Sequence, residues 1–400
     1  MDGVAEVVTG VQCLRVLLIE DDPDDVASIG ALLREMPGVQ VDITHVTRLS
    51  QGLACLAQGG VDVVLLDLML PDTQGLETFR EFHARSPGTP VVVMTALDCE
   101  EIALEAVREG AQDYLFKSAM NGSQLVRTVR YALERTRSRH VEQEFLATQR
   151  ELSIARQIQE GLYPQFPPTI PGYDIAGGSF PAKHVGGDYY DFLELTDHYL
   201  GIAIGDASGH GVGAALVSAE TRALLRALVI SHHSVDEIIT LANQVLTSGM
   251  KDTHFITLFL ARLNPRTASF VYTSAGHEMG YVLDANNELK AELTSTGIPL
   301  GVMADCEFPI SVGLKLAPGD TVILPTDGIR EARPSEESFF GAQRLIDVVR
   351  TNRERPACEI IDAIETAIRR HCHPHAPPDD FSAVILKVNQ DVVLTPNFAF

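Results

Sequence analysis

The sequence predicts two α/β domains joined by a helical connector. The first is a doubly wound parallel sheet, and the second mixes strands with paired helices in a way that suits an α-β-β-α sandwich. Three observations support this prediction. Before residue 121, four short apolar runs alternate with helical patterns, which is typical of a parallel sheet. From about residue 122, apolar positions recur at helical spacing until prolines end the pattern. Beyond residue 166, hairpin signals alternate with helical segments.

The apolar runs of the first domain, about residues 12–121, each end at polar residues. The runs are Arg15–Ile19, Val61–Leu66, Val91–Met94 and Asp113–Phe116, and the helical patterns between them are Asp25–Arg34, Leu76–Arg85 and Cys99–Glu109. The polar residues at the run ends are Glu20, Asp21, Asp67, Thr95 and Lys117. Because the carboxyl ends of parallel strands meet at one edge of the sheet, we expect these five residues in one crevice.

This set of residues resembles the receiver domain of two-component response regulators, over essentially the whole first domain. The resemblance implies a five-stranded parallel sheet and phosphorylation of Asp67, in LLDLMLP, within a signalling pathway that begins at a sensor histidine kinase. It implies that Thr95 and Lys117 contact the phosphoryl oxygens and that Tyr114 is the aromatic switch residue. It also implies a bound Mg²⁺, with ligands from Glu20, Asp21, Asp67 and the Met69 carbonyl.

The connector, about residues 122–165, carries two apolar faces. The first should pack on the sheet of the first domain and consists of Leu125, Val126, Val129, Ala132 and Leu133. The second repeats every seven residues, as a coiled-coil seam does, at Val141, Phe145, Thr148, Leu152, Ala155, Gln159 and Leu162. Since Thr148 and Gln159 interrupt the seam, we expect a homodimer of moderate strength. A single helix and a break near Arg139–His140 both fit the sequence.

A glycine-rich stretch, Gly186–Gly211, organises the second domain, about residues 166–390. A predicted strand, Tyr199–Ile204, leads Asp206 into a turn rich in glycine. A carboxylate in such a turn is typical of a metal site with oxygen ligands, although an aspartate that only caps the turn fits the local pattern too. Further acidic residues in a similar setting favour the metal site, and these are Asp188, Asp191, Asp327, Asp379 and Asp380.

Six ordered motifs extend this pattern over about residues 150–388. They are GGDYYDF, GDASGHGVGAAL, TSAGHEMG, STGIPLGV, PGDTVILPTDGIREA and PDDFSAVIL. Together they resemble the PPM metal-dependent protein phosphatases, and more narrowly the bacterial branch that acts on anti-sigma-factor antagonists. The resemblance implies an α-β-β-α sandwich with two Mn²⁺ or Mg²⁺ ions. It also implies hydrolysis of phosphoserine or phosphothreonine on a protein substrate of that class.

The resemblance assigns a ligand set by motif match: Asp188, Asp206, Ala207 through its carbonyl, Asp327, Asp379 and Asp380. Asp206 is implied to bridge the two metals, and Asp188 to serve the second one. The roles of Asp379 and Asp380 are not separated. Oxygen-only ligands favour Mg²⁺ or Mn²⁺ over zinc. His210 and His277 lie in glycine-flanked turns, where they either transfer protons or make structural hydrogen bonds.

Composition argues against several other classes of protein. The net charge of −23 disfavours nucleic-acid binding, and no apolar run approaches the ~20 residues that a membrane helix needs. The start of the chain has no basic region of the kind a secretory signal carries. Six cysteines without paired spacing indicate reduced thiols. We therefore expect a cytoplasmic protein without membrane or nucleic-acid partners, ending in a tail at residues 391–400.

The leading hypothesis is a response regulator whose output is a protein phosphatase. The alternative is a catalytically weak phosphatase fold that binds and sequesters a signalling partner. Loss of a metal-binding carboxylate would favour the alternative, and none of the expected carboxylates is missing. The sequence leaves open whether phosphorylation of Asp67 activates or inhibits.

Overall fold

The computed structural model describes residues 13–96, 100–195, 198–249, 254–334 and 338–390. The chain divides into two compact units, one ending at Thr148 and the other beginning at Gln149. Helix α5 (Gly122–Glu160) contributes residues to both units. It is one helix, so the possible break near Arg139–His140 is absent.

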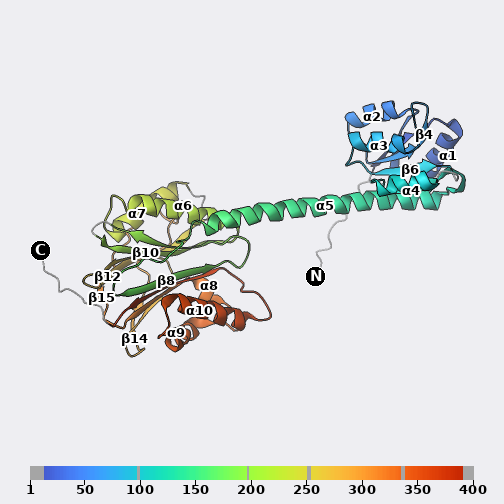
Figure 1. Ribbon diagram of the computed structural model, residues 1–400. Helices are drawn as coiled ribbons and strands as arrows, with labels where there is room; N and C mark the ends of the chain where they lie inside the picture. Colours follow the sequence, from blue (N-terminus) through green and yellow to red (C-terminus); the bar gives the residue numbers. More distant parts are fainter. Residues whose placement is uncertain (1–12, 97–99, 196–197, 250–253, 335–337, 391–400) are drawn as a thin grey trace, which may run out of the picture. The chain divides into compact units, whose positions relative to one another are not determined.

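The first unit is a doubly wound domain around a five-stranded parallel sheet in the order β2-β1-β3-β6-β7 (Figure 1). This arrangement confirms the predicted fold class. Its elements are β1 (Cys13–Ile19), α1 (Pro23–Arg34), β2 (Gln40–Val46), α2 (Leu49–Ala57), β3 (Val63–Asp67), β4 (Met69–Leu70), β5 (Thr73–Gln74), α3 (Leu76–Arg85), β6 (Val91–Thr95), α4 (Glu100–Arg108), β7 (Asp113–Phe116) and the short 3-10 helix η2 (Lys117–Ala119). Cys99, at the start of one predicted helix, lies outside the described residues.

The first part of α5 packs into this unit. Leu125, Val129 and Ala132 are at most 1% exposed and belong to the same core cluster as Leu33 of α1. The expectation for the first connector face is therefore confirmed. Farther along the helix, Val141 is 59% exposed. The seam predicted from the heptad spacing thus begins on an open helix surface.

The second unit is a sandwich of two five-stranded antiparallel sheets (Figure 1). One sheet has the order β15-β12-β11-β10-β9 and the other β14-β13-β16-β17-β8. The strands are β8 (Tyr173–Phe180), β9 (Asp188–Glu194), β10 (Leu200–Ala207), β11 (Ile256–Asn264), β12 (Ser269–Ala275), β13 (Gly280–Leu283), β14 (Leu289–Leu293), β15 (Leu314–Lys315), β16 (Thr321–Pro325) and β17 (Phe381–Val388). The helices are α6 (Val212–Leu228), α7 (Val235–Gly249), α8 (Asp327–Glu331), α9 (Gly341–Thr351) and α10 (Ala357–Cys372).

Helices cover the outer faces of both sheets, which confirms the α-β-β-α sandwich. Helices α6 and α7 lie on one sheet, and α9 and α10 lie on the other (Figure 1). Between the sheets, fully buried side chains such as Phe259 and Phe270 form a shared core. This packing fixes the strand ends that carry the acidic motifs.

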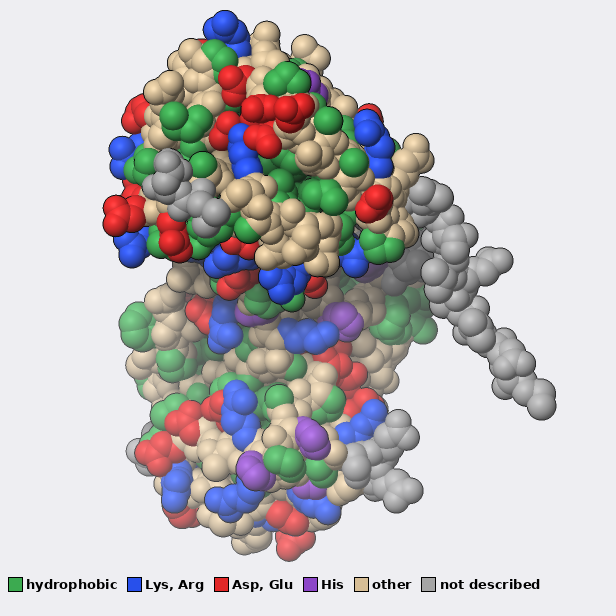
Figure 2. Space-filling model, turned by 90° about the vertical axis from the view of Figure 1, so that its right-hand side faces the viewer, with side chains coloured by type: hydrophobic (Ala, Val, Ile, Leu, Met, Phe, Trp, Pro, Cys, Tyr) green, Lys and Arg blue, Asp and Glu red, His purple; other side chains and the backbone are tan. Residues whose placement is uncertain are grey.

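The surface carries charges of both signs. On the face drawn in Figure 2, Lys and Arg side chains are interspersed with Asp and Glu. Among the residues that the structure describes, no helix combines the length and the apolar character needed to cross a membrane.

Candidate functional site

The five polar residues predicted to meet in the first unit lie at the carboxyl edge of its sheet. Ligand oxygens of Glu20, Asp21 and Asp67 all lie within 4.8 Å of one another. Glu20 and Asp67 are at most 3% exposed, whereas Asp21 is exposed. Burial, opposed by Lys117 and reinforced by the charge of Asp67, raises the pKa of Glu20 to about 7. Three carboxylates this close repel one another unless a cation lies among them.

Lys117 supplies such a cation from the end of β7. Its Nζ lies 2.8 Å from Asp67 Oδ2, 2.7 Å from Glu20 Oε2 and 2.9 Å from Asp25 Oδ2. Burial alone would lower the pKa of Lys117, but these hydrogen bonds raise it. The sequence analysis did not assign Asp25 to this crevice. It follows the strand end by several residues, and the sequence predicts that it begins a helix.

The remaining residues of this crevice differ in how closely they approach Asp67. The Met69 amide donates to Asp67 Oδ1 at 3.2 Å. Thr95 ends β6 and is 1% exposed, and Tyr114 stands edge-on to Phe116 with ring centroids 5.2 Å apart. The donor set around Asp67, all oxygen and partly buried, fits a small hard cation such as Mg²⁺.

The acidic motifs of the second unit come together at one end of the sandwich. Asp188 and Asp206 face each other as paired residues of β9 and β10. Gly187 allows this approach, because a Cβ there would lie 2.8 Å from the Ala207 carbonyl oxygen and 3.2 Å from Asp206 Oδ1. Asp327 starts helix α8 directly after β16, and Asp379 lies just before β17.

The buried carboxylates of this centre repel one another, and a positive charge among them would relieve that repulsion. Burial, followed by the charges of Asp188, Asp327 and Asp379, raises the pKa of Asp206 to about 9. Burial likewise raises the pKa of Asp188 to about 7. Asp188 Oδ2 accepts a hydrogen bond from Thr326 Oγ1 at 2.8 Å, while its Oδ1 is buried without a partner. An unpartnered buried carboxylate oxygen beside three further carboxylates fits a divalent cation.

The spacing of these carboxylates differs from that in the first unit. In the part of the chain that the structure describes, no three acidic groups of the second unit lie mutually within 4.8 Å.

Asp379 and Asp380, which the sequence left unseparated, have different environments. Asp380 is 7% exposed, and its two oxygens accept from the amides of Ala182 at 2.7 Å and Gly187 at 2.8 Å. Asp379 is exposed, and its Oδ1 accepts from the amide of Asp380 at 2.9 Å. Asp380 therefore holds the loop before Asp188, whereas Asp379 remains on the exposed side of this turn.

Asp191 does not belong to the centre, contrary to the grouping suggested by the sequence. It is fully buried, and Arg226 of α6 donates to both of its oxygens, at 2.6 and 2.8 Å. The reason is the alternation of a β-strand: residues 188 and 191 are three apart and point to opposite faces of the sheet. Asp191 joins β9 to helix α6.

The two histidines near the site differ in burial. His277 is 5% exposed and hydrogen-bonds through Nδ1 to Thr257 Oγ1 at 3.0 Å and through Nε2 to the Pro325 carbonyl at 3.1 Å. Burial lowers the pKa of His277 to about 4. Through these two hydrogen bonds, His277 links β11 of one sheet to β16 of the other. His210 is exposed, and its Nδ1 lies 3.4 Å from Lys183 Nζ.

Two residues near the connector's end reach the carboxylate centre, and sequence reasoning did not assign them to it. Gln159, 8% exposed, donates to the Gly186 carbonyl at 2.7 Å and accepts from the Gly186 amide at 3.1 Å. Tyr163 donates to the Asp188 carbonyl at 2.8 Å. The available signal was Gln159 itself, one of two polar residues in the predicted seam, which the heptad pattern treated only as an interruption.

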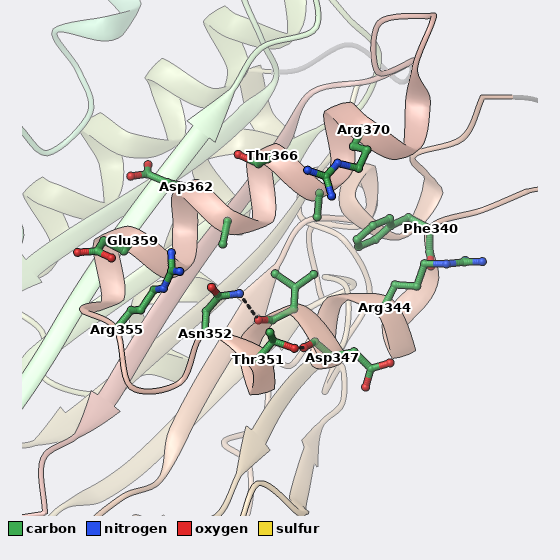
Figure 3. Close-up of a pocket in the computed structure, with 13 residues that line it drawn as sticks. Phe340, Arg344, Asp347, Thr351, Asn352, Arg355, Glu359, Asp362, Thr366 and Arg370 are labelled. Atoms are coloured by element: carbon green, nitrogen blue, oxygen red, sulfur yellow. Dashed lines mark hydrogen bonds between the residues drawn. The ribbon is translucent and has the colours of Figure 1, made fainter.

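A groove of about 750 Å³ between α9 and α10 lies apart from these residues (Figure 3). Arginine and acidic side chains line it together, including Arg355, Glu359, Asp362 and Arg370. It opens on the outer helical layer, whereas the carboxylates lie at the strand ends of the sandwich. The groove contributes none of the candidate metal ligands.

Comparisons with known proteins agree with this division. Residues 16–130 match the family model described as response regulator receiver domain, and residues 196–389 match the model for stage II sporulation protein E (SpoIIE). Protein IcfG of Synechocystis is 31% identical over 268 residues, which cover 60% of this chain and 42% of IcfG. The phosphoserine phosphatase RsbU of Bacillus subtilis is 28% identical over 237 residues, covering 59% of this chain and 70% of RsbU.

Among solved structures, the SiaA-PP2C domain of Pseudomonas aeruginosa superposes with a TM-score of 0.53 and 25% identity. The match covers 62% of this chain and 98% of that domain. The chain spans less than half of IcfG and about two thirds of RsbU. Its similarity to these proteins therefore concerns domains, not whole proteins.

Proposed function

We propose that this chain, which joins a response-regulator receiver domain to a phosphatase domain of the PPM family, hydrolyses phosphoserine or phosphothreonine on a protein. The substrate class we propose is an anti-sigma-factor antagonist. The observation that carries the proposal is the buried, unpartnered oxygen of Asp188 next to Asp206, Asp327 and Asp379. The name and sequence similarity of RsbU, a phosphoserine phosphatase, support it.

In this proposal, carboxylates of the second unit hold two Mn²⁺ or Mg²⁺ ions. When bound, such ions place positive charge beside the phosphoryl oxygens and make water a better nucleophile. Asp206 and Asp188 would hold the ions from adjacent strands, and the Ala207 carbonyl, Asp327 and Asp379 would complete the set. The water oxygen forms the new bond to phosphorus as the bond to the serine oxygen breaks, and a proton from the water goes to the serine oxygen, which releases inorganic phosphate and the free hydroxyl.

The direct test is phosphate release from a phosphoserine peptide with Mn²⁺, with Mg²⁺ and with a chelator. We expect turnover that requires the metal and falls by several orders of magnitude in Asp206→Ala, since that change removes a central carboxylate of the proposed ligand set. Near-normal turnover by that variant would contradict the assignment. A chain that binds a phosphoprotein tightly but releases no phosphate would instead support the alternative, a phosphatase fold that sequesters its partner.

We further propose that phosphorylation of Asp67, by a pathway that begins at a sensor histidine kinase, controls the phosphatase unit. The cluster of Glu20, Asp21 and Asp67 supports an Mg²⁺ site for this reaction, and Lys117 is within reach of the phosphoryl oxygens. Thr95 and Tyr114 are the proposed switch residues. The contact of Gln159 with Gly186 supports control through the connector, because a change in the end of α5 would reach the loop before Asp188.

The proposal includes a homodimer formed through α5. Val141 and Phe145 support it, because they are about 60% exposed and belong to no core cluster formed by the described residues of the first unit. It also includes a cytoplasmic location, which five free cysteines among the described residues favour.

A further inference from the structure

An exposed apolar patch lies beside the carboxylate centre of the second unit. It consists of Val212, Leu216, Phe255, Val302 and Met303, which are 46%, 66%, 40%, 56% and 52% exposed. We call it the rim patch. Exposed apolar residues that gather next to a site, unlike ones scattered singly, mark a place where another molecule binds.

Hydrogen bonds attach the rim patch to the loop that follows Asp206. The Ser208 amide donates to the Phe255 carbonyl at 2.8 Å, and the Phe255 amide donates to Ser208 Oγ at 2.9 Å. Ser208 is two residues from Asp206. Phe255 therefore belongs to the same rigid edge as the proposed bridging ligand.

Helix α6 contributes the second part of the patch. Val212 and Leu216 are four residues apart, which places them on one side of the helix. A Cβ on Gly213, between them, would lie 3.9 Å from His254 Nε2. The first turn of α6 therefore runs beside residues 254 and 255.

A pinned turn contributes the third part. Leu300 and Ile256 form an antiparallel bridge with hydrogen bonds of 3.0 and 2.9 Å, so the chain after Leu300 runs alongside Phe255. Fully buried Asn243 of α7 donates to the Met303 carbonyl at 2.8 Å and accepts from the Gly301 amide at 3.0 Å. A turn held this way exposes Val302 and Met303 without the entropy cost of ordering a loose loop on binding.

We propose that the rim patch binds the polypeptide segment that carries the phosphorylated residue and selects segments with apolar side chains next to it. This inference rests on the proposed phosphatase function. A phosphoryl group at the carboxylates places the neighbouring residues, at about 3.3–3.6 Å each, within reach of the patch. Burying an aliphatic side chain against Val302 and Met303 then adds binding free energy that a polar neighbour does not supply.

The test uses two synthetic phosphoserine peptides of equal length and charge, one with leucine and valine beside the phosphoserine and one with serine and glycine. For the full-length chain we expect kcat/KM about tenfold higher for the apolar peptide, the discrimination typical of one or two buried side chains. In the variant Val302→Ser with Met303→Ser, the two peptides should be hydrolysed equally well. Hydrolysis of p-nitrophenyl phosphate, which has no peptide, should change less than twofold.

The matched control is Ile230→Ser, which removes a 77% exposed isoleucine beyond the far end of α6 and should keep the preference. Equal hydrolysis of both peptides by the unaltered chain would overturn the rim patch while leaving the phosphatase function standing. Equal losses of activity on the peptides and on p-nitrophenyl phosphate in the Val302→Ser, Met303→Ser variant would also overturn it, because they would indicate damage to the site. A change in the sedimenting mass of that variant would overturn it as well, because the patch would then be a contact between copies of the chain. No hydrolysis of any substrate would overturn both proposals.

Discussion

Gln159 and Gly186 hydrogen-bond to each other in both directions, side chain to backbone. Gln159 Nε2 donates to the Gly186 carbonyl at 2.7 Å, and the Gly186 amide donates back to Gln159 Oε1 at 3.1 Å. Gly186 lies two residues before Asp188. The last turn of the connector helix thus holds the backbone that carries a proposed metal ligand, and Tyr163 holds the same backbone from the Asp188 carbonyl.

Replacing Gln159 by leucine tests this contact. Gln159→Leu keeps the size of the side chain and leaves the Gly186 amide and carbonyl without partners, which costs about 1–3 kcal/mol for each group that stays buried. We expect the Mn²⁺ concentration for half-maximal phosphate release to rise several-fold. The control is Gln157→Leu, on the exposed side of the same turn. An unchanged Mn²⁺ requirement in Gln159→Leu would show that this contact does not influence metal binding.

Asp379 and Asp380 should respond differently to the same substitution. Asp380→Asn replaces one of two oxygens that accept from backbone amides, so we expect a loss of about 1–3 kcal/mol in the free energy of unfolding. Asp379→Asn should leave unfolding nearly unchanged and weaken Mn²⁺ binding. Thermal unfolding and titration calorimetry with Mn²⁺ measure the two effects. If Asp379→Asn instead lowers stability and Asp380→Asn instead weakens Mn²⁺ binding, the two residues have the opposite roles.

The sequence predicted most elements because their apolar pattern was continuous or strongly periodic. The central strands β1, β3 and β6 are buried on both faces and read as apolar runs. The edge strand β2 was missed because Val41 and Ile43 alternate with polar residues and it has a neighbour on one side only. The receiver crevice was predicted from polar residues at strand ends, whereas the sandwich was predicted from the mixture of strands and paired helices and from the resemblance carried by the six ordered motifs.

The side-chain partners within the site could not be predicted in the same way. Asp188 and Asp191 stand in one motif, yet strand alternation sends one to the carboxylate centre and the other to Arg226. Asp380 and Asp379 are adjacent, and only the positions of Ala182 and Gly187 decide which carboxylate is occupied by amides. Contacts between segments almost 200 residues apart leave no local pattern.

The receiver should accept a phosphoryl group on Asp67. Incubation with acetyl phosphate and Mg²⁺ should add one phosphoryl group, seen by intact mass, and the adduct should be absent without Mg²⁺. Asp67→Asn should abolish it, and Asp62→Asn is the matched control, because Asp62 is engaged by Arg15 away from the crevice. The same adduct in Asp67→Asn would place the phosphoacceptor elsewhere.

The ion pair between Arg226 and Asp191 should contribute more to stability than an exposed ion pair on the surface of a helix does. Arg226→Ala leaves the fully buried Asp191 with the more distant Arg222, whose Nε lies 3.7 Å away, as its charged partner, besides neutral donors from Tyr189 and the Phe192 amide. Because Arg226 itself is about half exposed, we expect a loss of about 2–3 kcal/mol in chemical denaturation, toward the low end for a broken buried pair. Arg369→Ala, which breaks an exposed helical pair with Glu365, should cost less than about 0.5 kcal/mol. Equal losses in the two variants would contradict this account of Asp191.

His277 should make the second unit less stable at acidic pH. Burial lowers its pKa in the folded chain to about 4, from 6.5 for a free histidine, so the unfolded chain binds the extra proton first as the pH falls. Stability is therefore highest above pH 6.5 and decreases toward pH 4, by up to about 3 kcal/mol from this residue. His277→Gln can still donate to the Pro325 carbonyl but takes up no proton. We expect it to be less stable than the unaltered chain at pH 7.5 and to lose less stability between pH 7 and pH 5, in urea denaturation curves recorded at each pH. Parallel pH profiles for the two proteins would show that His277 does not carry this dependence.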